Sequence, residues 1–193
     1  MLLTVSGPPG GGKTTTAVAL ANRLGLDHLS GGDIFRSVAA DRGLSVVELN
    51  EVAEDDPSID LELDHRLQAI ADERDDVVLE SRLAGWLAGD QADFRFWLDA
   101  PVEVRSARIA EREGGDPTVI ANETMVREKS EAKRYREYYE IDISDRSIYD
   151  LAVTTSRWDA DAVTEILINA IERFDPADDE GAQSIPPIEL PEV

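Results

Sequence analysis

The sequence predicts an α/β protein with three layers, in which helices cover both faces of a parallel sheet of five strands. Short apolar runs rich in β-branched residues alternate along the chain with longer segments of helical periodicity, as is typical of parallel sheets. A glycine-rich segment stands directly after the first apolar run and directly before the first helical segment. With 193 residues and 42% hydrophobic composition, the chain has the length of one domain.

Each predicted strand is short, and a polar segment and a helix follow it. The strands are expected at 2–5, 27–29, 77–79, 94–98 and 151–153. The helices are expected at 14–24, from the Ser30-Gly31-Gly32-Asp33 segment through Ala39, and at 45–54, 57–75, 101–113, 122–139 and 160–174. Asp56 and Asp159 are predicted N-caps, and Gly114-Gly115-Asp116-Pro117 is expected to break the chain between two helices. Ligands of such sheets bind at the carboxyl ends of the strands.

The last 19 residues differ in composition from the rest of the chain. From Asp175 onward there are four prolines, six acidic residues and no basic residue. Such a segment buries too little apolar surface to fold by itself. We therefore expect one domain over 1–174 and a mobile acidic tail over 175–193.

Charge narrows the range of partners. Asp and Glu number 41 against 19 Lys and Arg, so the formal net charge is −22. An acidic surface repels nucleic acids and anionic membranes, whose affinity for proteins comes from basic residues, and we expect neither as a partner. A halophilic cytoplasm, where salt screens the self-repulsion, explains the excess better than an ordinary acidic protein does.

Other absences in the sequence point to a cytoplasmic protein. There is no cysteine, which excludes disulfides and thiolate metal sites. The N-terminus lacks the basic start of a signal peptide, and no apolar run approaches the roughly 20 residues of a membrane span. We expect a monomer, because no apolar stripe suggests a dimer.

One motif carries specific chemistry. The residues Gly7-Pro8-Pro9-Gly10-Gly11-Gly12-Lys13-Thr14 fit the phosphate-binding P-loop pattern G-x-x-x-x-G-K-[ST], between a predicted strand and a predicted helix. Glycines let the backbone curl so that its N–H groups point at phosphates, and the helix that follows adds its positive end. Lys13 is expected to reach the β- and γ-phosphates of ATP, Thr14 to bind Mg²⁺ directly, and Thr15 to contact an α-phosphate oxygen.

Beyond this motif, the chain from Met1 to about Phe174 resembles the nucleoside-monophosphate kinases, and most closely the archaeal type of cytidylate kinase. Two segments carry the resemblance, Ser30-Gly31-Gly32-Asp33-Ile34-Phe35-Arg36 and Glu80-Ser81-Arg82-Leu83-Ala84-Gly85-Trp86. In such kinases these positions bind the acceptor nucleotide. The resemblance therefore implies that Asp33, Arg36 and Arg82 bind the monophosphate and that Glu80 holds Mg²⁺ through water. Each assignment has an alternative. Arg36 is then a solvated arginine on a helix surface, and Glu80 and Arg82 form a structural ion pair.

A group of arginines around the Gly-Gly break resembles a short lid over about 108–134. Its members are Arg105, Arg108, Arg112, Arg127 and Arg134. Phosphoryl transfer needs cations over the moving group, and Lys13, Arg82, Arg108 and Arg134 are our predicted catalytic residues. Helix salt bridges to nearby glutamates are the alternative for each arginine.

Further along, Tyr135, Tyr138 and Tyr139 precede Asp142 and Asp145 in a segment that also resembles the archaeal type. Aromatic side chains at helical spacing usually pack, so we expect these tyrosines in the core rather than stacked on a base. The two histidines are isolated, and no role is predicted for them.

The resemblance implies transfer of the γ-phosphoryl group of MgATP to CMP or dCMP, with small nucleotides as the only partners. Two alternatives stay open at this point. One is a kinase for another monophosphate, such as UMP or AMP, or for a small metabolite. The other is a nucleotide-dependent ATPase or switch acting on a protein partner.

Overall fold

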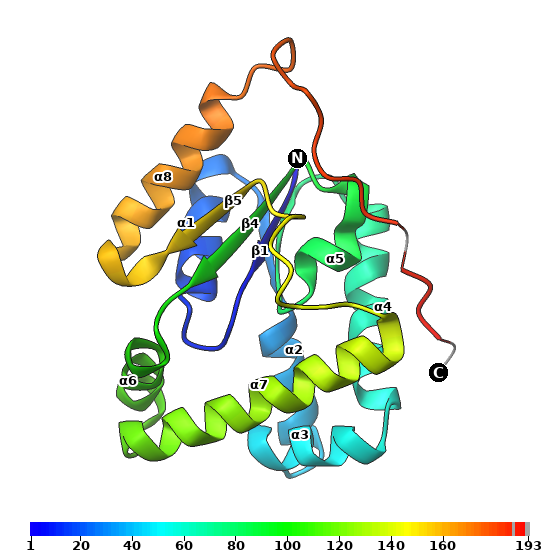
Figure 1. Ribbon diagram of the computed structural model, residues 1–193, viewed down its shortest axis with the longest axis vertical. Coiled ribbons are helices and arrows are strands. Elements are labelled where there is room, and N and C mark those ends of the chain that lie inside the picture. The colour runs from blue at the N-terminus through cyan, green and yellow to red at the C-terminus, as the bar shows by residue number, and fades with distance from the viewer. Residues whose placement is uncertain (187, 192–193) are drawn as a thin grey trace.

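The computed structural model describes residues 1–186 and 188–191, and it contains a parallel sheet of five strands in the order β2-β3-β1-β4-β5 (Figure 1). The strands are β1 (Leu2–Ser6), β2 (Asp27–Ser30), β3 (Val77–Glu80), β4 (Phe94–Asp99) and β5 (Leu151–Thr154). The predicted fold class and the predicted number of strands are confirmed.

Except for α5, for which no range was predicted, the helices lie close to their predicted positions. They are α1 (Lys13–Leu24), α2 (Gly31–Asp41), α3 (Val46–Asp55), α4 (Ser58–Glu73), α5 (Ala84–Ala88), α6 (Val102–Glu113), α7 (Pro117–Tyr139) and α8 (Ala160–Arg173), with single 3-10 turns at Gly89–Gln91 and Thr155–Arg157. Within the described part of the chain, no helix has the length and apolar content needed to span a membrane.

Two helix starts differ from the prediction. α7 begins at Pro117 rather than near Asn122, because the Oδ1 atom of Asp116 accepts a hydrogen bond of 2.7 Å from the Thr118 amide and Pro117 takes the first helical position. α4 begins at Ser58, one residue after its predicted start, and its N-cap is Pro57 rather than the predicted Asp56. Asp56 still accepts a 3.1 Å hydrogen bond from the Ser58 amide.

Alternate residues of each strand face opposite layers. Leu2, Val77, Leu79 and Trp97 pack with α4 and α5 on one face, whereas Leu3, Val5, Val78, Phe96 and Leu98 pack with α1 and α8 on the other. Figure 1 shows these pairs of helices on the two sides of the sheet. The β1–β3 register, with Val5 opposite Glu80, brings the ends of both strands to one edge.

A smaller core lies beyond that edge. It consists of Phe35, Ala39, Leu49, Ala53 and Ile59, from α2, α3 and the start of α4. Helix α7 runs across this region in Figure 1, and its last turns reach the main core through Tyr135 and Tyr139, both buried. The packing role predicted for the tyrosines is thus confirmed.

The C-terminal segment lies against the domain, which does not fit a tail that is free along its whole length. Ile185 is buried in the main core, where Ile188 and Leu190 also pack. Its amide donates a 2.9 Å hydrogen bond to Asp90, and the Gln183 carbonyl accepts one of 3.0 Å from the buried Arg95. These contacts anchor the segment to the 3-10 turn after α5 and to β4.

We expect Ile185→Asp to destabilise the domain by about 2–4 kcal/mol, because it places an unpaired carboxylate where an apolar side chain is buried. Ala182→Asp adds the same charge at an exposed position of the same segment and should change the free energy of unfolding by less than about 0.5 kcal/mol. Urea denaturation at one fixed salt concentration measures both. Equal stabilities for the two variants would show that the segment is not held against the core.

Candidate active site

The P-loop joins β1 to α1 and has the backbone geometry that its glycines were expected to provide. Gly7, Gly10 and Gly12 have positive φ angles of 147°, 74° and 95°. At Gly7 a side chain is also excluded by space, because a Cβ atom would lie 2.0 Å from the Leu98 carbonyl oxygen. Gly12 is the N-cap of α1, so the free amides of the first helical turn open toward the loop.

The carbonyl groups of the loop are held from outside by three side chains. Arg105 donates to the Pro9 carbonyl at 3.1 Å, Arg108 to the Gly10 carbonyl at 3.2 Å, and Thr155 to the Gly11 carbonyl at 3.0 Å. Fixing these carbonyls on the outer side helps to keep the amides on the inner, anion-binding side.

This arrangement places Arg105 and Arg108 beside the P-loop, and their predicted role in a lid stays a prediction. Arg105 is buried, donates to the Ala100 carbonyl at 2.8 Å and pairs with Glu128 at 2.5 Å, so it ties α6 and α7 to the loop. Arg108 also donates to the Thr155 hydroxyl at 2.9 Å, beside the loop. Arg112 pairs with its exposed neighbour Glu113.

Lys13, Thr14 and Glu80 form one polar group at the carboxyl ends of β1 and β3. The Thr14 hydroxyl donates a 2.9 Å hydrogen bond to Glu80, and the Lys13 ammonium donates one of 3.1 Å to the Pro8 carbonyl. Burial lowers the pKa of Lys13 to about 8, although the charge of Glu80 acts in the opposite direction. Burial also acts to raise the pKa of Glu80, but His28, Lys13 and Thr14 outweigh it and the net shift is downward.

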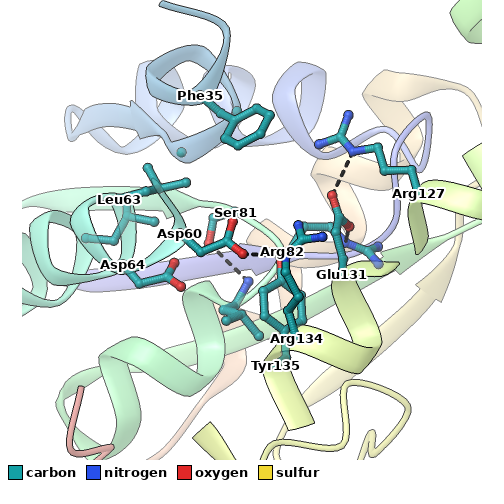
Figure 2. A pocket seen from close by; sticks show the side chains of 14 residues that line it. Phe35, Asp60, Leu63, Asp64, Ser81, Arg82, Arg127, Glu131, Arg134 and Tyr135 are labelled. Atoms are coloured by element: carbon teal, nitrogen blue, oxygen red, sulfur yellow. Dashed lines mark hydrogen bonds and ion pairs between the residues drawn. The ribbon is translucent and has the colours of Figure 1, made fainter. Parts of the chain in front are cut away.

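A cavity opposite the P-loop is lined by residues of α2, α4, α7 and the segment after β3 (Figure 2). Gly31, Gly32 and Phe35 form one wall, and Leu63 and Leu67 contribute apolar surface. The charged residues that line it are Asp60, Asp64, Arg82, Arg127, Glu131 and Arg134. The cavity therefore combines an apolar slot with several fixed charges, as a site for a polar small molecule does.

The end of the cavity nearer the P-loop is cationic. Arg82 and Arg127 both contact Glu131, and the charges of all three affect the pKa of Lys13. Arg82 was predicted for this place and lines the cavity as expected. Arg127 also lies over the ring of Phe35, with 5.7 Å from its guanidinium carbon to the ring centroid.

The other end of the cavity carries two buried carboxylates from α4. Asp60 accepts a 2.6 Å hydrogen bond from Arg134, which also donates to Asn50 at 3.1 Å. Asp64 accepts a 2.7 Å hydrogen bond from the Tyr139 hydroxyl, and burial raises its pKa to about 8. Arg134 is only 3% exposed and lies at this end, and its predicted catalytic role in the lid stays a prediction.

Asp33 and Arg36 sit at the rim of this region. Their side chains pair with each other at 2.6 Å, and both are about half exposed or more, at 63% and 47%. The neighbouring Gly32 and Phe35 line the cavity, whereas Asp33 and Arg36 do not. Their predicted contact with the acceptor phosphate stays a prediction, since Arg36 would have to turn inward.

Sequence reasoning missed Arg146, in the loop between α7 and β5. Its guanidinium stacks on Trp97 of β4, with 3.5 Å from the guanidinium carbon to the ring centroid. Burial lowers the pKa of Arg146, and the charge of Arg82 acts in the same direction, which places two guanidinium groups in one neighbourhood. Asp60 and Asp64 were missed as well. Nothing in the sequence shows which acidic residues of α4 face the cavity and which face the solvent.

A second cavity lies on the outer side of the P-loop. Gly12, Thr15, Arg108 and Thr155 line it together with Trp158, whose indole is 54% exposed. Its position beside the first turn of α1 and the segment after β5 suits the nucleoside part of a nucleotide whose phosphates occupy the loop.

Comparisons with known proteins agree with this geometry. The fold and the P-loop, with one cavity beside the loop and a second one lined by arginines, define a kinase of the P-loop class. The chain matches the cytidylate kinase-like family model over residues 2–157, and it belongs to this family. It is 60% identical to a cytidylate kinase of Halorubrum lacusprofundi over 185 residues, covering 96% of each chain. It is 62% identical to a cytidylate kinase of Haloquadratum walsbyi over 181 residues, covering 94% of each chain.

The same fold occurs in more distant kinases. A shikimate kinase of Bacteroides thetaiotaomicron superimposes with a TM-score of 0.60 and 14% identity, covering 89% of this chain and 98% of the other. The two close relatives come from halophilic archaea, which agrees with the halophilic interpretation of the acidic composition.

The raised pKa of Asp64 predicts a pH dependence of stability. Its carboxyl group stays protonated in the folded protein up to about pH 8 but ionises in the unfolded chain near the ordinary pKa of an aspartate, 3.8. The folded state then binds more protons across this window, so Asp64 makes the free energy of unfolding fall as the pH rises from about 4 to 8. Asp64→Asn should remove this fall, with a slope difference of up to about 1.4 kcal/mol per pH unit.

Urea denaturation of the wild type and Asp64→Asn at pH 5, 6, 7 and 8 measures this difference. Glu62→Gln, at an exposed position of the same helix, is the control and should leave the slope unchanged. Parallel curves for all three proteins would mean that Asp64 ionises normally in the fold.

Proposed function

We propose that this protein transfers the γ-phosphoryl group of ATP to the 5′-phosphate of CMP or dCMP. The observation that carries this proposal is the arrangement around Lys13, with the P-loop on one side and Arg82 and Arg127 on the other. These two arginines line the cavity between α2, α4 and α7, which we call the acceptor cavity. Two phosphate-binding sites that meet at one lysine suit a reaction between two phosphorylated ligands. The family and the names of the two close relatives support the choice of the acceptor.

On the donor side, the P-loop amides and Lys13 bind the triphosphate. The nucleoside lies in the second cavity, between Arg108 and Trp158. Mg²⁺ would be held by Thr14 directly and by Glu80 through water, since both offer oxygen atoms and Glu80 is ionised at neutral pH, and it would neutralise charge on the phosphates. Across the described residues no cluster of three or more acidic or histidine ligands occurs, which suits an ion shared with phosphates and water.

On the acceptor side, the phosphate of CMP lies against Arg82 and Arg127, and its base points toward α4. An oxygen of the acceptor phosphate attacks the γ-phosphorus atom, a new P–O bond forms, and the bond to the β-phosphate oxygen breaks to release ADP. Because the acceptor is already an anion, the chain needs no general base. Lys13, Arg82, Arg127 and Arg146 neutralise the charge that spreads over the transferred group.

The base end of the cavity has the hydrogen-bonding pattern of cytosine. Asp60, held by Arg134, presents an acceptor to the 4-amino group of cytosine. Asp64, protonated at neutral pH, can donate to N3. Uracil has the opposite pattern, with an acceptor at position 4 and a donor at N3, so this pair of side chains favours cytosine over uracil.

A coupled assay of ADP release with CMP, dCMP, UMP, AMP or no acceptor tests the proposed reaction. We expect CMP and dCMP to be the best acceptors and turnover without an acceptor to be slow. Lys13→Ala should lower kcat with CMP by at least about 100-fold, because it removes a cation that contacts the transferred group. ATP hydrolysis that no acceptor accelerates would instead support a switch or ATPase.

A pair of variants tests the assignment of the base. Asp60→Asn replaces the acceptor by a group that can donate to uracil, so the ratio of kcat/KM for CMP to that for UMP should fall by about tenfold or more. Asp64→Asn keeps a donor at its position and should change this ratio much less. If both variants keep the preference of the wild type for CMP, the base is recognised elsewhere.

A further inference from the structure

Glu131 lies between Arg82 and Arg127, two of the three arginines that line the acceptor cavity, as Figure 2 shows. Its side chain is 4% exposed. Arg127 donates a 2.7 Å hydrogen bond from Nε to the Oε1 atom of Glu131, and the Nε atom of Arg82 lies 2.8 Å from its Oε2 atom. Burial acts to raise the pKa of Glu131, but Arg127 and Arg82 outweigh it and hold the pKa at about 2. The carboxylate is therefore ionised at neutral pH.

In both arginines Nε is the atom that contacts Glu131. Arg127 Nε donates a hydrogen bond, whereas the contact of Arg82 Nε with Oε2 is an ion pair without hydrogen-bond geometry, and none of the hydrogen bonds found among residues 1–186 and 188–191 comes from a terminal Nη atom of Arg82 or Arg127. A guanidinium group binds phosphate best through two parallel N–H groups, and here the pairs of terminal nitrogens stay available for that contact.

Arg82 and Arg127 need a carboxylate between them to stay close together, because two buried cations repel each other. Without a carboxylate between them, each long side chain would regain its rotamer freedom and turn away from its neighbour. Arg127 is 28% exposed and Arg82 is 13% exposed, so both have space in which to move. Asp60 lies in the same cavity, but Arg134 already pairs with it.

We infer that Glu131 is a positioning residue for the acceptor phosphate: it holds Arg82 and Arg127 by their Nε edges, so that their terminal nitrogens form one preorganised phosphate clamp. This inference rests on the proposed function, in which these two arginines bind the phosphate of CMP. It assigns no contact between Glu131 and the substrate.

A different role is conceivable for a carboxylate among arginines. Glu131 could stand in for the phosphate and be displaced by it, and its removal would then strengthen binding of CMP. The Nε contacts favour positioning, because a stand-in would occupy the terminal nitrogens that the phosphate uses. The two roles predict opposite changes in KM.

The experiment compares wild type, Glu131→Gln, Arg82→Ala and the double variant in steady-state assays with CMP and ATP varied separately. Glu131→Gln should raise the KM for CMP by about tenfold or more, since small displacements of substrate-binding groups have effects of this size, and leave the KM for ATP nearly unchanged. Arg82→Ala should raise the KM for CMP as well. In the Arg82→Ala background, Glu131→Gln should add less than it does alone, because one of the two arginines through which it acts is missing.

Two further variants keep the test decisive. Glu123→Gln removes one negative charge from an exposed position of the same helix and should leave both KM values unchanged. Glu131→Asp keeps the charge with a shorter reach, should fold if Glu131→Gln does not, and should give an intermediate KM for CMP. Thermal unfolding of each variant shows whether it is folded.

The outcomes separate the inference from the function on which it rests. If Arg82→Ala leaves the KM for CMP unchanged, the proposed phosphate site itself is wrong. If Arg82→Ala raises that KM while folded Glu131→Gln and Glu131→Asp do not, the site stands and the positioning role fails. A lower KM for CMP in Glu131→Gln, or fully additive effects in the double variant, would also overturn it.

Discussion

The parallel pairing of β1 with β3 determines where the chemistry can occur. It sets Val5 opposite Glu80, so that the P-loop, which starts two residues after Val5, leaves the sheet beside the acidic end of β3. The Thr14–Glu80 hydrogen bond depends on this register. Arg82 follows two residues later and leads into the acceptor cavity. A shift of β3 by one residue against β1 would turn the side chains of β3 to the opposite faces of the sheet and separate these groups.

Helix α7 completes the acceptor side from a single face. Arg127, Glu131 and Arg134 follow each other at intervals of four and three residues, so their side chains lie along one line of the helix. Glu131 contacts Arg82 as well as Arg127, and Arg134 reaches Asp60 on α4. Tyr135 and Tyr139 pack the last turns of α7 into the main core, and this packing fixes the position of the helix face relative to the sheet.

The sequence predicted the parts of the site that are local in the chain and missed those that depend on distant contacts. The P-loop and the Glu80–Arg82 segment could be read because strand, loop and ligand residues follow one another directly. Arg134 meets Asp60 across 74 positions, and no periodicity of α4 shows which of its acids face inward. The tail was misjudged because its average composition hides Ile185 among prolines and acids, although this one side chain is buried in the core.

The acidic composition and the arginines of the site follow from different physical demands. At molar salt the screening length is only about 3 Å, so an exposed pair such as Asp33–Arg36 has little influence on a ligand. Buried charges are screened far less, and the Arg82–Glu131–Arg127 group is largely shielded from solvent. Recognition of an anion by an anionic protein in a salty solution therefore has to take place inside the cavity, among charges that the protein itself holds in position.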